Sequence, residues 1–250
     1  MDNLRNLRCH IAYNGKGFSG FQIQPNKRTV ELELNKTLSS ALGEAVKVVG
    51  CSRTDAGVHA RDYCFNVFTS NNSIPDNGLL RLVGGLLPTD ISLKSLVTTD
   101  NDFHARYSCV GKRYVYLLCT APTADVFVPS FHVSRSLDIT EMNKSANVLI
   151  GEHDFSAFCA AEAKTRLLST VREVTDVSVS EQNGSFTRIE VSGKGFLHNM
   201  VRIIAGTLLY VGVGRFTVED VAYALQSGDR AKAGKTLPGY ALYLEEVFYS

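Results

Sequence analysis

The chain has 250 residues, 44% of them hydrophobic and 20% charged, a composition that excludes the disordered and collagen-like classes of protein. Lys and Arg exceed Asp and Glu by only 26 − 25 = 1. Net charge therefore does not indicate a nucleic-acid-binding protein, and any anionic partner would have to be held by a local basic patch.

Six cysteines are spaced too widely for a zinc cluster, and none of the six histidines forms an H-x-x-x-H pair, so we expect no metal. The first residues have no apolar leader core, and no apolar stretch approaches the roughly 20 residues of a membrane span. Scattered thiols in apolar runs are typical of reduced cysteines. We therefore expect a cytoplasmic protein, or one of an organelle matrix or the nucleus if its source is eukaryotic.

The spacing of apolar residues predicts four elements in the first half of the chain. They are a strand over residues 7–13, a helix over 30–46, a strand over 63–68 and a short helix over 79–87.

The second half continues with strands and helices in mixed order. The predicted elements are a strand over 112–119, a helix over 140–150, a hairpin of 171–180 and 186–192, a helix over 197–208, a helix from a capping box at Thr217, and a strand over 242–249. Because this order lacks the regular alternation of a parallel sheet, we predict an α+β fold with mainly antiparallel pairing. The polar stretch 100–108 suggests two domains, 1–104 and 105–250.

Gly15-Lys16-Gly17-Phe18-Ser19-Gly20 matches the G-x-G-x-x-G pattern of dinucleotide-binding folds. That site needs a helix to begin at the loop, since the N-terminus of the helix binds the pyrophosphate. Here Pro25 and polar residues follow. The sequence therefore favours a flexible glycine turn and no nucleotide cofactor.

A short loop gathers Arg53, Asp55, His59 and Arg61 around Gly57. Asp and Gly are common in ordinary turns, where Asp caps the backbone and Gly supplies a positive φ. The alternative is a functional carboxylate, because a neighbouring arginine keeps an aspartate ionised, as a nucleophile requires. In extended chain, Arg53 and Asp55 would share a face.

Two further clusters combine basic and apolar residues. Lys194, His198 and Arg202 surround the start of the helix predicted over 197–208, where basic side chains attract phosphate, and His198 and Arg202 would share a helix face. In 103–107 and 112–116 aromatic and basic residues alternate, as in proteins that stack on RNA bases. The alternatives are an ordinary solvated Arg202, although an arginine in so apolar a run usually has a partner, and a Tyr-rich strand of the core, as such strands more often are.

Taken together and in this order, the motifs resemble the TruA family of tRNA pseudouridine synthases. The resemblance covers nearly the whole chain, and its most specific block is Arg53-Thr54-Asp55-Ala56-Gly57-Val58-His59-Ala60. Other matching blocks are Tyr13-Asn14-Gly15, Gly20-Phe21-Gln22, 103–108, 113–116, 151–158, 195–206 and Leu242-Tyr243-Leu244.

This resemblance implies two ferredoxin-like halves whose sheets join across a cleft, a homodimer, and catalysis without cofactor or metal. The substrate would be a uridine of the tRNA anticodon arm, at positions 38 to 40. The matched residues are Asp55 as the essential aspartate, Arg53 for displacing the target nucleotide, Tyr114 for stacking on uracil, Arg202 for pairing with the aspartate and Leu242 for lining the uracil pocket. His59, Arg61, Lys194 and His198 are expected to face RNA. The rival from another class is a non-catalytic RNA-binding module on the same scaffold.

Overall fold

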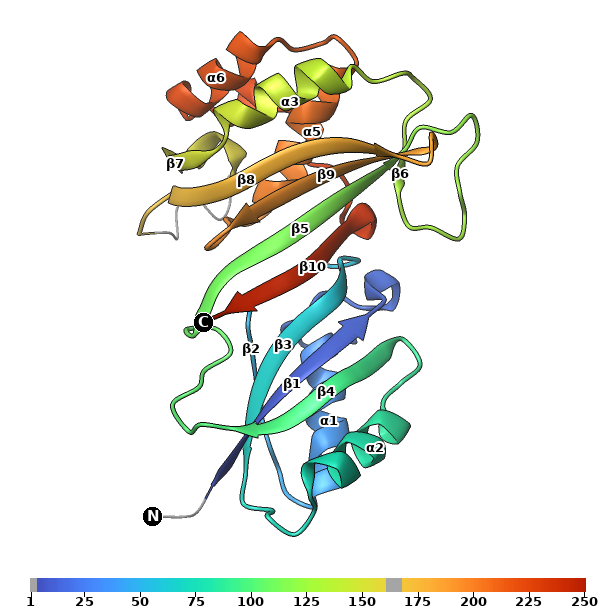
Figure 1. Ribbon diagram of the computed structural model, residues 1–250, viewed down its shortest axis with the longest axis vertical. Helices are drawn as coiled ribbons and strands as arrows, with labels where there is room; N and C mark the ends of the chain where they lie inside the picture. The colour runs from blue at the N-terminus through green and yellow to red at the C-terminus, as the bar shows by residue number, and fades with distance from the viewer. Residues whose placement is uncertain (1–3, 161–167) are drawn as a thin grey trace. The chain divides into compact units, whose positions relative to one another are not determined.

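The computed structural model describes residues 4–160 and 168–250 (Figure 1). The chain divides into two compact units. Unit 1 comprises Met1–Val110 and Leu244–Ser250, and unit 2 comprises Gly111–Tyr243. Compact units are not by themselves independently folding domains, so the predicted domains 1–104 and 105–250 stay a prediction.

Unit 1 is a sheet with two helices. Its elements are β1 (Arg5–Tyr13), η1 (Gly15–Gly17), α1 (Val30–Leu42), β2 (Val48–Gly50), β3 (His59–Thr69), α2 (Asp76–Leu86), β4 (Ile91–Thr99) and most of β10 (Leu242–Tyr249). The strand order is β4-β1-β3-β10, with β2 also paired to β3. The pairs of β1 with β3 and β4 are antiparallel.

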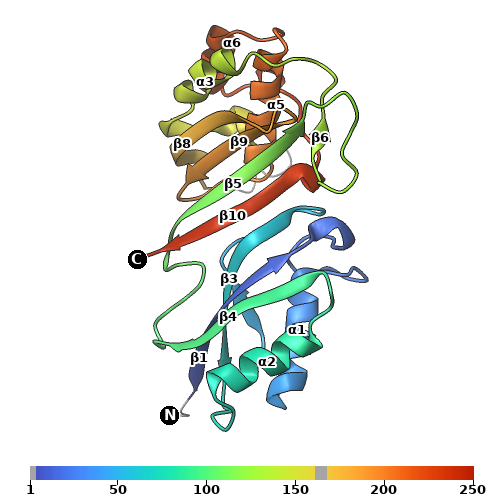
Figure 2. The ribbon, with the colours of Figure 1, turned by 45° about the vertical axis from the view of Figure 1, so that its right-hand side comes forward.

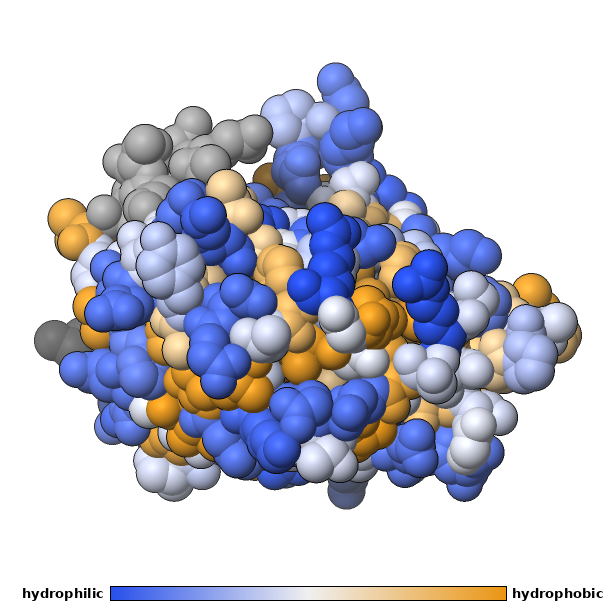
Figure 3. All heavy atoms as spheres, turned by 90° about the horizontal axis from the view of Figure 1, so that it is seen from above, coloured by the Kyte–Doolittle hydropathy of each residue, from blue (hydrophilic) through white to orange (hydrophobic). Residues whose placement is uncertain are grey.

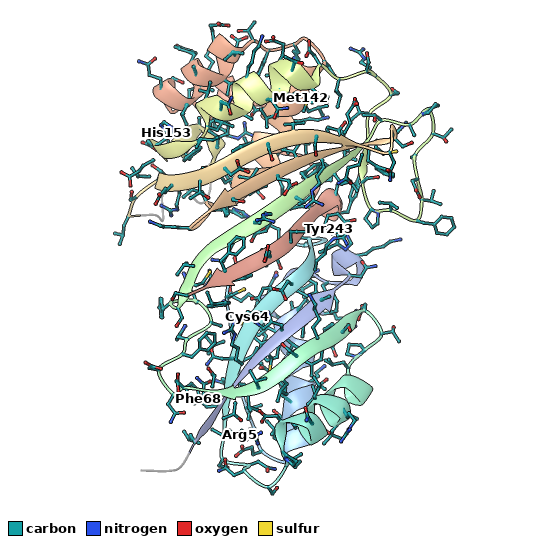
Figure 4. The ribbon with its side chains drawn as sticks, viewed as in Figure 1. Arg5, Cys64, Phe68, Met142, His153 and Tyr243 are labelled. Carbon is teal, nitrogen blue, oxygen red and sulfur yellow. The ribbon has the colours of Figure 1, made fainter. Side chains whose placement is uncertain are left out.

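Alternation in β1 explains how this sheet forms its core. Leu7, Cys9, Ile11 and Tyr13 are at most 4% exposed. They are two residues apart, so their side chains lie on one face of the sheet. Helices α1 and α2 lie together against a single face of the sheet (Figures 1 and 2). At the start of β1, Arg5, labelled in Figure 4, forms a salt bridge with Asp76 at the start of α2.

Unit 2 consists of mostly antiparallel strands covered by helices. Its elements are β5 (Cys109–Cys119), β6 (Phe131–His132), α3 (Ile139–Val148), β7 (Gly151–Asp154), η2 (Ser156–Phe158), β8 (Val171–Gln182), β9 (Phe186–Gly193), α5 (Met200–Gly212), α6 (Val218–Ser227), η3 (Arg230–Lys232) and η4 (Gly239–Ala241). The strand order is β5-β9-β8-β7, and β6 pairs with β5 in parallel.

Local sequence signals set the ends of several elements in unit 2. Asn183 and Gly184 have φ of 51° and 63°, which matches the left-handed turn that joins β8 and β9. Thr217 and Asp220 form the predicted capping box of α6. The helix ends at Gly228, which is left-handed, as Gly at this position often is.

Helices α3 and α5 pack closely in unit 2. Met142 of α3, labelled in Figure 4, lies so near α5 that a Cβ at Gly212 would stand 2.5 Å from its sulfur.

Seen from the side of unit 2 that carries α3 and α6, the surface shows hydrophobic atoms between hydrophilic ones (Figure 3). Within the described residues, no helix has the length and apolarity needed to cross a membrane.

The predicted α+β class with mainly antiparallel pairing is confirmed. The two ranges predicted as a hairpin form β8 and β9, and the strand predicted over 242–249 is β10. The helix predicted over 30–46 ends at Leu42, because Gly43 adopts the left-handed conformation with φ of 73°.

Candidate active site

Asp55 lies in the irregular segment between β2 and β3 of unit 1. Its side chain is half-buried, Thr54 before it is buried and Arg53 is exposed. The N–H of Val58 donates to the carbonyl of Asp55 at 3.2 Å, which closes a tight turn. Gly57 has a φ of 79° in this turn, a conformation that a side chain would strain.

Residues 15–21, which include the glycine pattern of dinucleotide loops, form backbone hydrogen bonds with this turn. The N–H of Gly57 donates to the carbonyl of Phe18 at 3.3 Å, and the N–H of Phe21 donates to the carbonyl of Thr54 at 3.1 Å. Hydrogen bonds therefore anchor the backbone both before and after Asp55. The next α-helix, α1, begins only at Val30, and not at this loop, where the dinucleotide motif needs a helix to begin.

Two glycines let the two segments meet at backbone distance. A Cβ at Gly15 would lie 2.0 Å from the carbonyl oxygen of Val58. A Cβ at Gly20 would lie 2.7 Å from the carbonyl oxygen of Thr54, and Gly20 also has a φ of 94°. Both glycines are therefore required for close packing of the backbone. The sequence predicted only a flexible glycine turn here.

An aromatic and hydroxyl layer lies beneath the loop. The hydroxyls of Tyr13 and Thr54 are 2.9 Å apart and hydrogen-bonded. The rings of Phe21 and Tyr63 stack with centroids 4.5 Å apart, and the hydroxyl of Tyr63 donates to the carbonyl of Ser52. This rigid base is the kind of support that keeps a catalytic side chain in one position.

The other two residues that the sequence placed in this loop, His59 and Arg61, belong to strand β3 instead, and their surroundings differ. His59 is only 4% exposed, and its Nδ1 accepts a hydrogen bond from the N–H of Gly15 at 3.1 Å. Little of the ring is left to face a phosphate. Arg61 is exposed and lies 3.3 Å from a carboxylate oxygen of Glu245.

Arg202 lies near the start of α5 in unit 2, and hydrogen bonds hold its side chain. Its Nε donates to the carbonyl of Leu237 at 2.6 Å, and its Nη1 donates to Oδ1 of Asn199 at 2.6 Å. Asn199 is itself left-handed, with a φ of 64°. The guanidinium is therefore oriented by its own unit before any partner binds.

Tyr114 and Leu242 are both buried in unit 2, at 6% and 5% exposure. Tyr114 comes from β5, and its ring meets that of Phe196 edge-on, with centroids 5.3 Å apart and planes at 89°. Leu242 begins β10 directly after η4.

The remaining two predicted residues precede α5. Helix α5 begins at Met200, so His198 lies outside it, and the expectation that His198 and Arg202 share a helix face is wrong. The left-handed Asn199 separates the two positions. His198 and Lys194 are exposed, and the Lys194 ammonium lies 2.7 Å from Glu173, which raises the pKa of Lys194 through this hydrogen bond.

Arg53, Asp55, His59 and Arg61 thus belong to unit 1, and the other predicted residues belong to unit 2. In the part of the chain that the structure describes, no group of three or more His, Cys, Asp or Glu side chains is arranged to hold a metal ion.

Comparisons with known proteins agree with these motifs. Residues 146–250 match the sequence profile described as tRNA pseudouridine synthase. The tRNA pseudouridine synthase A of Ruminiclostridium cellulolyticum is 44% identical to this chain, covering 98% of this chain and all of that protein.

Two other relatives give the same result. The tRNA pseudouridine synthase A of Acetivibrio thermocellus is 40% identical over 98% of this chain and its own full length. That of Bacillus subtilis is 41% identical over 97% of this chain and 98% of its own. With such identity over nearly full length, the chain belongs to the TruA family of tRNA pseudouridine synthases.

Proposed function

We propose that this chain converts uridine to pseudouridine in the anticodon arm of tRNA, at positions 38 to 40, with Asp55 as the catalytic carboxylate and without cofactor or metal. The observation that carries the proposal is the anchoring of the Asp55 loop. Backbone hydrogen bonds at Thr54 and Gly57 fix the chain on both sides of a half-buried aspartate. An ordinary surface turn needs no such support.

The reaction is an isomerisation in which no atom is gained. The bond between the sugar C1′ and uracil N1 breaks, the uracil turns, and a bond from C1′ to C5 forms. The proton of C5 leaves and N1 ends protonated. An aspartate can act as nucleophile at C1′ or at uracil C6, or as base at C2′.

The target base must first leave the RNA stack, which costs a few kcal/mol. We assign this step to Arg53, whose exposed side chain can fill the space that the base leaves. We assign Tyr114 to stacking on the displaced uracil and to handling the C5 proton through its hydroxyl. Leu242 then gives an apolar wall that retains the free base.

Arg202 is proposed to pair with Asp55 and keep it ionised. The hydrogen bonds of Arg202 to Leu237 and Asn199 support this role, because they orient its guanidinium group. Arg61, Lys194 and His198 are proposed to contact RNA phosphates, since all three are exposed. For Arg61 and Lys194 this contact competes with Glu245 and Glu173.

We further propose that the protein acts as a homodimer in the cytoplasm, where its substrate would be the anticodon stem-loop of tRNA. Each unit is proposed to be a ferredoxin-like half. In unit 1 the order β4-β1-β3-β2 with two helices on one face supports this assignment.

The test uses unmodified tRNA transcripts incubated with the parent protein and with Asp55→Asn. Pseudouridine is mapped by carbodiimide labelling and primer extension, and tRNA affinity is measured by filter binding. We expect stops at 38, 39 or 40 with the parent, and at least a thousandfold slower modification by Asp55→Asn with tRNA affinity retained, since the amide cannot act as nucleophile or base.

Asp138→Asn is the matched control, because Asp138 caps α3 and asparagine caps helices equally well. Full activity of Asp55→Asn would remove this residue from the reaction. Stops at other positions would keep the reaction and change the target. Tight binding of every tRNA with no modification by the parent would instead support the RNA-binding module.

A further inference from the structure

His59 is a buried histidine whose protonation state is fixed by one contact. Its Nδ1 lies 3.1 Å from the backbone nitrogen of Gly15 and accepts that N–H. A ring nitrogen that accepts a hydrogen bond carries no proton. The imidazole is therefore the tautomer with its proton on Nε2, and this ring is an acceptor toward Gly15.

Gly15 begins the short turn that carries the support of the Asp55 loop. The N–H of Phe18 donates to the carbonyl of Gly15 at 3.0 Å, and this closes η1. The carbonyl of Phe18 then accepts the N–H of Gly57, two residues after Asp55. A continuous path of hydrogen bonds thus runs from His59 through η1 to the loop.

The same turn is also held by Asp90, the residue before β4. The N–H of Asn14 donates to the carbonyl of Asp90 at 2.9 Å. The Asp90 carboxylate receives both terminal nitrogens of Arg28, at 2.6 and 2.9 Å, and the guanidinium lies 4.2 Å from the centroid of the Phe18 ring. On the side of the turn that faces the Asp55 loop, the hydrogen bond from the Gly15 N–H to Nδ1 of His59 holds η1 in place.

We propose that His59 is a positioning residue for Asp55, which acts by accepting the Gly15 N–H and thereby fixing η1 against the loop. The inference rests on the proposed function, since it assumes that Asp55 carries the reaction. It replaces the expectation that His59 contacts RNA phosphate. The requirement is for an acceptor at the place of Nδ1, and not for a positive charge.

This requirement separates three substitutions of similar size. Asparagine can place its Oδ1 near the position of Nδ1, glutamine places its polar atoms near Nε2, and leucine offers no acceptor. His59→Asn should therefore keep the hydrogen bond from the Gly15 N–H, whereas His59→Gln and His59→Leu should lose it. His132→Leu is the control, because His132 lies in unit 2, where its Nε2 is 3.0 Å from the carbonyl oxygen of Ala121.

The experiment measures the single-turnover rate of pseudouridine formation and the Kd for the same tRNA transcript. We expect His59→Gln and His59→Leu to slow turnover about 10- to 100-fold, as a misplacement of about 1 Å does, with Kd changed less than twofold. His59→Asn should stay within about threefold of the parent. Hydrogen exchange of the Gly15 amide should be accelerated in His59→Gln and His59→Leu only.

Two outcomes would overturn the proposal. Weakened Kd with an unchanged rate would assign His59 to phosphate contact. Equal loss in His59→Asn and His59→Gln would show that the acceptor position is irrelevant. If His59→Leu does not fold, the comparison of Asn with Gln decides. An inactive parent would refute the proposed function, while hydrogen exchange of the Gly15 amide would still show whether residue 59 accepts its hydrogen bond.

Discussion

At the scale of single residues, a second histidine of unit 1 has a very different environment from His59. Nδ1 of His10 lies 2.9 Å from Oδ1 of Asp62, and the Lys94 ammonium lies 3.6 Å from the same oxygen. The hydrogen bond to Asp62 raises the pKa of His10 to about 9. Burial alone would raise the pKa of Asp62, but the bond to His10 and the charges of His10 and Lys94 lower it.

This pair makes stability depend on pH. The pKa of His10 is higher in the folded than in the unfolded state, so its stabilisation is complete below about pH 6.5 and is lost as the pH rises through about 9. His10→Gln should lower the free energy of unfolding by about 2 kcal/mol at pH 6, less than the full shift implies because the pair is partly exposed. At pH 10 the difference should vanish.

Urea unfolding of parent and variant at pH 6, 8 and 10 measures this difference. Asp62→Asn is the matched variant, since it removes the partner and leaves the imidazole in place. A difference between parent and His10→Gln that stays constant from pH 6 to 10 would contradict the role of the charged pair.

At the residue scale, the sequence singles out candidate positions where a motif suggests chemistry, but it does not reveal which side chains are buried. Arg53 and Asp55 stand out because an arginine beside an aspartate is unusual in a turn. The surroundings of His59 could not be predicted, because its partner Gly15 is 44 positions away in the chain. Nothing local to residue 59 indicates that pairing.

At the scale of elements, helix α6 shows how closely a local signal fixes a boundary. The hydroxyl of Thr217 accepts the N–H of Asp220 at 3.3 Å, and the Asp220 carboxylate accepts the N–H of Thr217 at 2.9 Å. Both groups satisfy donors that a helix start leaves open.

Thr217→Ala removes one half of this capping box. We expect it to lower the free energy of unfolding by about 1 kcal/mol, which corresponds to roughly 2–4 °C in the midpoint of thermal unfolding. Thr217→Ser keeps the hydroxyl and should unfold within a degree of the parent. A scanning calorimeter measures both, and equal midpoints for alanine and threonine would refute the cap's contribution.

Strand β4 is the longest of the described strands that periodicity did not predict, and its geometry gives the reason. Pairing with β1 shifts between His10 and Ile11, so that Ser95 faces His10 while Leu93 faces Ile11. Lys94 is the extra residue of this bulge. Buried Ile91 and Leu96 are consequently five positions apart, and the period of two that identifies a strand is interrupted.

At the scale of the whole chain, unit 1 is completed by residues that follow unit 2. Leu244 and Val247 of β10 are buried, at 0% and 6% exposure. The hydroxyl of Tyr249 donates to the carbonyl of Ala105 at 2.6 Å, and Arg8 lies 4.6 Å from the centroid of the Tyr249 ring. Sequence periodicity predicted the strand, but a return to the first unit is a long-range pairing that periodicity does not encode.

Deleting 244–250 should therefore destabilise unit 1 selectively. Loss of two buried apolar side chains removes roughly 3–5 kcal/mol of stabilisation. Hydrogen exchange followed by mass spectrometry should accelerate in peptides from β1 and β3, with peptides from β8 and β9 unchanged. Deletion of Ser250 alone is the control. Uniform acceleration in both units would mean that β10 stabilises the chain as a whole.

The late position of β10 also has a consequence for biosynthesis. A ribosome that adds about 5–20 residues per second needs roughly 7–27 seconds to make unit 2 after the first 110 residues have been synthesised. Throughout that interval β3 lacks β10, its neighbour in the finished sheet. An open strand edge is a template for pairing with other chains. The part of β3 that β10 later covers is thus an open edge in the nascent polypeptide, and a chaperone that shields it would protect the chain from aggregation until β10 is made.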